Sequence, residues 1–203
     1  MFILVSPLSK VMLLVADRAP ERVVSLLDPD ATFPEFGSAY VGHHLRLRLH
    51  DVHVASVGEV SATAKHIDAL LAFLAQWRRS APILIHCRAG MGRSPAAAFI
   101  AACLYNPGVD ELEIASALRR VSSTSRPNES LVGLADAALG RCGRMTKAIV
   151  ESGRGLSWPP VDEGRSFEFP AVIEPNKAPE PTTLAVTPRA EPRVAPARVV
   201  AHL

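Results

Sequence analysis

The feature of this sequence that most constrains its fold is the stretch 82–105, where an apolar run, a glycine-bearing loop and a long apolar segment follow one another. The run from Pro82 to Ile85 predicts a short buried strand. The Ala-rich segment that begins at Ser94 predicts a helix with Pro95 in its first turn. Because the centre of that helix carries no charge, we expect it to be buried and to hold the preceding loop in place.

The loop itself predicts a cradle for an anion. It contains one cysteine, two glycines and two arginines, and it lies between a strand and a helix N-terminus, where backbone N–H groups and the helix dipole favour negative charge. Cys87 opens the loop and Arg93 closes it, with five residues between them. This arrangement suits the attack of a thiolate on phosphorus.

Each residue type in the loop has a physical reason for that chemistry. An ordinary cysteine thiol, with a pKa of about 8.5, is mostly protonated at neutral pH, and amide donors with a nearby guanidinium favour the thiolate. Arg93 offers a planar fork for two phosphoryl oxygens. Ser94 could donate to the sulfur, and His86 could hold the loop through its ring N–H. The candidate phosphate-binding residues are Arg88, Ala89, Gly90, Met91, Gly92 and Arg93.

The pattern His86-Cys87, five residues, Arg93-Ser94 resembles the signature of the cysteine-dependent protein tyrosine and dual-specificity phosphatases of the small single-domain type. The resemblance implies a phosphocysteine intermediate on Cys87, transition-state binding by Arg93, a catalytic aspartate upstream, and neither a metal nor a cofactor. A cysteine and an arginine at this spacing also occur in rhodanese-like sulfurtransferases and in arsenate reductases. The flanking residues favour the phosphatases.

Asp51 is the candidate for the upstream acid. The stretch His44–Asp51 alternates leucines with polar residues, which predicts a strand that delivers Asp51 to one end of the sheet, 36 positions before Cys87. In the phosphatase family such a loop holds the aspartate that protonates the departing oxygen. We expect His50 and His53 to be ordinary loop histidines rather than a metal pair. Weaker acid candidates are Asp28, Asp30 and Asp68.

The remaining patterns predict an α/β fold, with a central mixed, mostly parallel sheet flanked by helices and the loop at the C-terminal end of a strand. Arg22–Leu27 predicts another strand. Ser6 and Ser61 are expected N-caps of two helices. Two later helices are expected over Asp110–Ser122, with an apolar stripe that includes Leu112 and Val121, and from Glu129. Asn128 caps the second or, as the resemblance implies, helps to orient the hydrolytic water.

The composition changes after residue 157. Nine of the seventeen prolines fall in residues 158–203, so we expect a catalytic domain over 1–157 and a disordered, Pro-rich tail over 158–203. Phe167 and Phe169 are the tail residues that could dock back onto the domain.

Charge and hydropathy exclude several functions. The net charge of +2 gives no basic field for nucleic acid, and no apolar run approaches the roughly 20 residues that span a membrane. The three cysteines, Cys87, Cys103 and Cys142, show no metal spacing and favour a reducing compartment. We therefore expect a cytoplasmic protein.

The expected substrate is a phosphorylated protein. A phosphorylated lipid or inositol is the alternative within the phosphatases, but such enzymes often carry extra lysines in the loop, where this chain has Arg88 and Met91. A sulfurtransferase with a persulfide on Cys87 and a non-catalytic phosphate-binding module remain open as other classes. The sequence does not indicate an oligomeric state.

Overall fold

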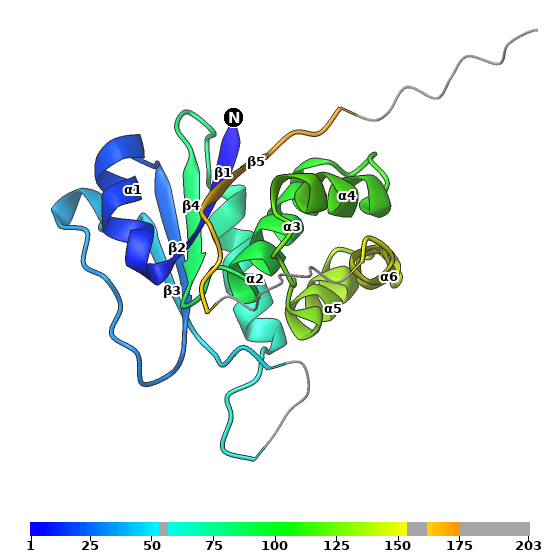
Figure 1. The fold of residues 1–203 in the computed structure, drawn as a ribbon, viewed down its shortest axis with the longest axis horizontal. Coiled ribbons are helices and arrows are strands. Elements are labelled where there is room, and N and C mark those ends of the chain that lie inside the picture. Colours follow the sequence, from blue (N-terminus) through cyan, green and yellow to red (C-terminus); the bar gives the residue numbers. More distant parts are fainter. Residues whose placement is uncertain (53–56, 154–161, 175–203) are drawn as a thin grey trace, which may run out of the picture.

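The computed structural model describes residues 1–52, 57–153 and 162–174, and in these residues five strands form one sheet in the order β3-β2-β4-β1-β5 (Figure 1). The strands are β1 (Phe2–Pro7), β2 (Arg22–Leu27), β3 (His44–Arg48), β4 (Ile83–Cys87) and β5 (Phe167–Pro170). The first four are parallel, whereas β5 runs antiparallel beside β1. The predicted α/β fold with a mostly parallel sheet is confirmed.

Helices cover both faces of the sheet (Figure 1). One face carries α1 (Val11–Arg18), and the other carries α2 (Ala64–Ala75), α3 (Arg93–Tyr105), α4 (Glu111–Val121), α5 (Glu129–Ala138) and α6 (Arg144–Glu151). Successive side chains of a strand point to opposite faces, so the strand residues divide between two cores. Leu4, Val23 and Leu84 pack toward α1, while their neighbours along the strands join the larger core under the other five helices. This burial on both faces explains why the central strands β2 and β4 are largely apolar along their whole length.

The central strand and the central helix hold the cysteine loop between them. β4 lies between β1 and β2, and all five of its residues are buried. In α3 every residue from Arg93 to Cys103 is buried, as its lack of charge predicted. The loop therefore connects two buried elements at the C-terminal edge of the parallel strands, where α/β folds place their sites.

Several predicted boundaries were wrong. No helix begins at Ser6, because β1 extends to Pro7 and Ser6 pairs with His86 of β4. The following helix α1 starts only at Val11 and buries that residue alone, leaving the adjacent Leu13 exposed. Helix α2 is capped not by Ser61 but by Thr63, whose capping box with His66 satisfies the first N–H groups.

The predicted stripe of α4 was only half right. Ala115 and Leu118 are buried, but Leu112 and Val121 are exposed. The helix instead turns Glu111 inward, and the Asp110 carboxylate caps it by accepting the Leu112 N–H. A buried ionic partner for Glu111 explains this rotation.

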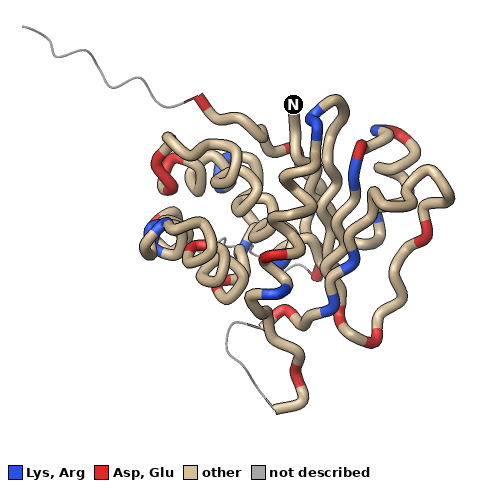
Figure 2. Tube along the Cα trace, turned by 180° about the vertical axis from the view of Figure 1, so that it is seen from behind, with Lys and Arg blue, Asp and Glu red and all other residues tan. Residues whose placement is uncertain are grey.

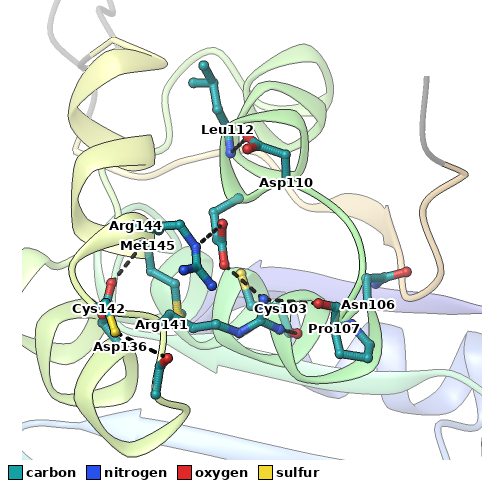
Figure 3. A network of polar contacts seen from close by, with 12 residues as sticks. Cys103, Asn106, Pro107, Asp110, Leu112, Asp136, Arg141, Cys142, Arg144 and Met145 are labelled. Carbon is teal, nitrogen blue, oxygen red and sulfur yellow. Dashed lines mark hydrogen bonds and ion pairs between the residues drawn. The ribbon is translucent and has the colours of Figure 1, made fainter. Parts of the chain in front are cut away.

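That partner belongs to a polar network near the C-terminal end of α3 (Figure 3). Arg141 donates to Glu111 over 2.8 Å and to the Cys103 carbonyl oxygen over 2.7 Å, and Arg144 reaches the second Glu111 oxygen. The network ties the end of α3 to α4 and α6. Burial raises the pKa of the Cys103 thiol, so this cysteine is an inert core residue.

The sheet continues beyond the expected domain boundary. Residues 167–170, within the tail expected to be disordered, form β5, and Phe169 is fully buried, so Phe167 and Phe169 dock back onto the domain as was considered. The reason is that β1 would otherwise expose an unpaired edge, which the Phe-Glu-Phe alternation is suited to cover. Residues 162–166 and 171–174, which flank β5, are described as well. The other tail residues, 158–161 and 175–203, lie outside the described residues.

Charged positions of both signs are scattered over helices and loops in the view from behind (Figure 2). This distribution agrees with the small net charge. Within the described part of the chain, no helix combines the length and the hydropathy that a bilayer crossing requires.

Candidate active site

The loop between β4 and α3 is built so that its carbonyl groups face outward. Four of its carbonyl oxygens accept hydrogen bonds from the backbone N–H groups of surrounding segments. These pairs are Arg88 O with Leu8 N–H (3.1 Å), Ala89 O with Gly164 N–H (2.8 Å), Met91 O with Arg126 N–H (2.7 Å) and Gly92 O with Asn128 N–H (3.2 Å). In a trans peptide the C=O and the following N–H point in opposite directions. The N–H groups of residues 89, 90, 92 and 93 therefore turn toward the inside of the loop.

Cys87 lies at the centre of this ring, and its residue is only 1 % exposed. The Gly90 N–H donates to its sulfur over 3.2 Å, and the Ser94 Oγ lies 3.1 Å from the same atom. Gly90 has a φ of +73°, and a Cβ there would come within 2.7 Å of the Pro7 nitrogen. Only glycine fits this position, so one of the two predicted glycines is explained by backbone contact.

Arg93 is anchored along one side of its guanidinium. Its Nη1 donates to Asp28 Oδ1 (2.8 Å) and to the Leu49 carbonyl oxygen (2.5 Å). The side chain is 3 % exposed, and its buried Nε has no hydrogen-bond partner. A buried donor without a partner is rare and costly, and here it marks a position that an oxyanion would satisfy.

Asp51 lies beside this unsatisfied donor. Its Oδ2 is 3.9 Å from Arg93 Nε, and its Oδ1 accepts a hydrogen bond from Asn128 Nδ2 (2.8 Å). The carboxylate also lies against Gly92, where a Cβ would come 2.6 Å from Oδ1 and closer still to Oδ2. The structure thus brings together the predicted cysteine, arginine and aspartate. The second glycine, Gly92, leaves the space that the Asp51 carboxylate occupies.

Asn128 makes the predicted N-cap contact and also binds Asp51, while a role in orienting the hydrolytic water stays a prediction. Its Oδ1 accepts the Leu131 N–H, which makes it the predicted N-cap of α5. Its Nδ2 donates to Asp51 and to the Val52 carbonyl oxygen. One side chain therefore both begins a helix and holds the carboxylate.

The His86 ring takes part in a polar chain across the sheet, and its expected role in holding the loop stays a prediction. Its Nε2 lies 2.5 Å from Ser25 Oγ on β2, which in turn lies 2.7 Å from Nε2 of His44 on β3. Burial, and secondly the neighbouring His44, lowers the pKa of His86 to about 3. Burial, with a contribution from Arg46, lowers the pKa of His44 to about 4. Both rings are neutral at physiological pH and join three strands behind the loop.

The other candidates have structural surroundings or lie outside the described residues. His50 Nδ1 accepts the Val60 N–H (2.8 Å), which fits an ordinary loop histidine, and His53 lies outside the described residues. Among the described residues no group of three His, Cys, Asp or Glu side chains is arranged to hold a metal.

Sequence reasoning missed the role of Asp28, which it ranked only as a weak acid candidate. Asp28 directly follows β2, as Asp51 follows β3 two residues beyond Leu49. Because parallel strands end at one edge, polar residues just after each strand converge there, and this signal could have found the Asp28–Arg93 pair. Nothing in the sequence pointed to Gly164.

Comparison with known proteins gives two kinds of match. Residues 56–128 match the protein-tyrosine phosphatase family profile, a range that includes Cys87, Arg93 and Asn128 but begins after Asp51. No curated protein sequence matches the chain. Among solved structures, DUSP15 is 15 % identical with a TM-score of 0.51, over 75 % of this chain and 92 % of that one. A PTP-2 phosphatase of Cydia pomonella is 21 % identical with a TM-score of 0.47, over 66 % of this chain and 83 % of that one.

At this identity the likeness to DUSP15 concerns the fold alone, while the profile match covers the segment that holds the cysteine loop. Residues 56–128 thus resemble the protein-tyrosine phosphatase family in sequence, and the chain shares its fold with DUSP15.

Proposed function

We propose that this protein hydrolyses phosphomonoesters through a phosphocysteine intermediate on Cys87. The observation that carries the proposal is the ring of inward N–H groups around the cysteine sulfur, of which the Gly90 N–H already donates to it. Such donors favour a thiolate and would also hold the equatorial oxygens of a phosphoryl group. The unpartnered Nε of the buried Arg93 adds a cationic donor at the same place.

In the first step the Cys87 thiolate attacks phosphorus, a sulfur–phosphorus bond forms, and the bond from phosphorus to the ester oxygen breaks. Asp51 gives its proton to the departing oxygen. Its position 3.9 Å from Arg93 Nε supports this role, since the bound phosphoryl group would bring negative charge beside the carboxyl and favour its protonated form. Asn128 keeps the carboxyl oriented by its 2.8 Å contact.

In the second step water attacks the phosphorus of the phosphocysteine. The Asp51 carboxylate takes a proton from this water, the sulfur–phosphorus bond breaks, and phosphate is released. The Ser94 hydroxyl, 3.1 Å from the sulfur, donates to it as it leaves as a thiolate. Arg93 and the amide groups of Ala89, Gly90, Gly92 and Arg93 hold the equatorial oxygens in both steps.

The proposal is tested with 4-nitrophenyl phosphate and the full-length protein. Cys87→Ser should abolish turnover, whereas Cys142→Ser is the matched control, because Cys142 is exposed and its sulfur donates to the Gly140 carbonyl oxygen. An unchanged rate in Cys87→Ser would refute the nucleophile.

Asp51→Asn tests the acid separately. It should lower kcat by about 100-fold with 4-nitrophenyl phosphate. With 2,4-dinitrophenyl phosphate, whose leaving group needs little protonation, the deficit should shrink to a few-fold. Equal deficits with both esters would mean that Asp51 is not the proton donor.

The same assays separate the other classes. A sulfurtransferase would transfer sulfur from thiosulfate to cyanide through Cys87 and would not depend on Asp51. A binding module would retain inorganic phosphate or vanadate without hydrolysing either ester.

We propose a phosphorylated protein as the substrate. Arg88 is exposed and Met91 is partly exposed. They supply one cation and one apolar contact rather than the several cations suited to a multiply charged inositol phosphate. A phosphotyrosine or phosphoserine peptide should therefore be hydrolysed faster than a soluble phosphoinositide at equal concentration, and the reverse order would assign the protein to lipid substrates.

A further inference from the structure

The segment 162–174, here called the C-terminal strap, returns to the sheet after the last helix (Figure 1). Its β5 pairs antiparallel with β1, and Phe169 and Ala171 are fully buried. The buried Asn106 at the end of α3 donates to the Ala171 carbonyl oxygen (2.9 Å) and accepts the Ile173 N–H (2.9 Å). The strap is therefore firmly attached at the end remote from the cysteine loop.

Its other end lies on the loop itself. Gly164 is buried, and its N–H donates to the Ala89 carbonyl oxygen over 2.8 Å. A Cβ on Gly164 would come 2.9 Å from Met91 Cγ. Beside it, the Ser9 hydroxyl donates to Glu163 Oε1 (2.5 Å).

The bond from Gly164 bears on the nucleophile through one peptide group. The Ala89 carbonyl that accepts from Gly164 and the Gly90 N–H that donates to the Cys87 sulfur belong to the same planar unit. Hence the Gly164 N–H, that peptide and the sulfur form one continuous row of hydrogen bonds.

We propose that Gly164 is a positioning residue, which holds the Ala89–Gly90 peptide with its N–H toward the Cys87 sulfur. The proposal rests on the proposed function only in that the sulfur must act as a thiolate. Rotation of this peptide would exchange the N–H for a carbonyl oxygen, and a carbonyl dipole would repel the thiolate. Glycine at position 90 makes such a rotation easy, because it tolerates most backbone conformations. A partner for the Ala89 carbonyl is therefore needed to keep one orientation.

Two variants of the full-length protein separate the hydrogen bond from the space it occupies. Gly164→Ala keeps the N–H and adds the contact with Met91, whereas Gly164→Pro adds a similar contact and removes the N–H. The readout is the rate of Cys87 alkylation by iodoacetamide between pH 5 and 9, located by peptide mass spectrometry so that Cys103 and Cys142 do not contribute. This reaction requires no phosphate ester.

The midpoint of the alkylation profile should rise by about one pH unit in Gly164→Pro. Below the midpoint this corresponds to a roughly tenfold smaller fraction of thiolate. In Gly164→Ala it should stay within about 0.3 pH units of wild type, which is a factor of two. A profile in Gly164→Pro equal to that of Gly164→Ala, with both proteins folded by circular dichroism, would overturn the proposal and leave the strap as a cover for β1. The proposed hydrolysis would stand in that case, because the wild-type profile and the ester assays are measured separately.

Hydrogen exchange on the wild-type protein provides a second test that needs no variant. The Gly164 amide should exchange as slowly as the amides of β5. Exchange at the rate of an unprotected peptide would also overturn the proposal, even if Gly164→Pro failed to fold.

Discussion

Replacing Gly92 by alanine should separate the proton donor from the nucleophile. A Cβ at this position would come 2.6 Å from Asp51 Oδ1 and closer to Oδ2, whereas carbon and oxygen without a bond rarely approach within about 3.3 Å. The backbone of Gly92 has a negative φ of −107°, so alanine adds no left-handed strain. The carboxylate is the end of a short side chain, and it should retreat by about 1 Å and leave Asn128.

A displacement of about 1 Å in a reacting group costs on the order of 100-fold in rate, which corresponds to about 2.7 kcal/mol of transition-state stabilisation. We therefore expect kcat for 4-nitrophenyl phosphate to fall about 100-fold in Gly92→Ala, while the alkylation rate of Cys87 stays near that of wild type. Gly133→Ala is the matched control, since the nearest atom to a Cβ there is 3.8 Å away.

The decisive comparison uses Asp51→Asn as the background. Asparagine has the same shape but no proton to give, so adding Gly92→Ala to it should cost only a few-fold. A full 100-fold loss in that background as well would refute the reasoning, because the damage would then lie in the amide ring and not in the position of the acid.

Glu111→Ala should lower the free energy of unfolding by about 3–5 kcal/mol in urea titrations, because it leaves the buried Arg141 without its ionic partner; a loss below 1 kcal/mol would contradict this. His44 has a folded pKa of about 4, below the ordinary 6.5, so the unfolded chain binds its proton first and stability is lost as the pH falls from 6.5 toward 4. In His44→Gln the unfolding free energy should therefore decline less steeply, by about 0.7 kcal/mol per pH unit. This is half of the roughly 1.4 kcal/mol per pH unit that one proton contributes, because the ring is partly exposed. An unchanged slope would exclude His44 as a source of the pH dependence. Asn128→Ala should lower both the melting temperature and kcat, the latter roughly tenfold, because Asp51 is no longer held. Asn128→Ser should restore the cap of α5 and hence the melting temperature, but not kcat. Recovery of both in Asn128→Ser would show that the contact with Asp51 is not used.

Two contacts on one side of the Arg93 guanidinium fix its position. Its Nη1 is bound to Asp28 and to the Leu49 carbonyl oxygen, which offsets the cost of burying a guanidinium. Only the Nε side faces Asp51, at 3.9 Å. The arginine is therefore held in place by one acidic residue while the opposite side stays available, and this arrangement preorganises it for an oxyanion.

The sequence by itself determined the elements whose signals are local. The apolar run before Cys87, the glycines after it and the uncharged helix from Ser94 describe one strand, one loop and one buried helix, and each is where the pattern predicted it. The parallel sheet followed from the same alternation of strands and helices. The roles of Cys87, Asp51, Arg93 and Ser94 stay predictions, although their side chains lie close together.

Only the tertiary structure decided how that loop is oriented and what surrounds it. The outward direction of its carbonyl groups depends on N–H donors at Leu8, Arg126, Asn128 and Gly164, which lie far from it in the sequence and carry no side-chain signature for this purpose. The same holds for the strap, whose proline-rich setting predicted disorder although Phe169 fills a buried place beside β1. Backbone hydrogen bonds between distant segments are nearly independent of residue type, so a sequence can specify which loop binds an anion without revealing what holds it open.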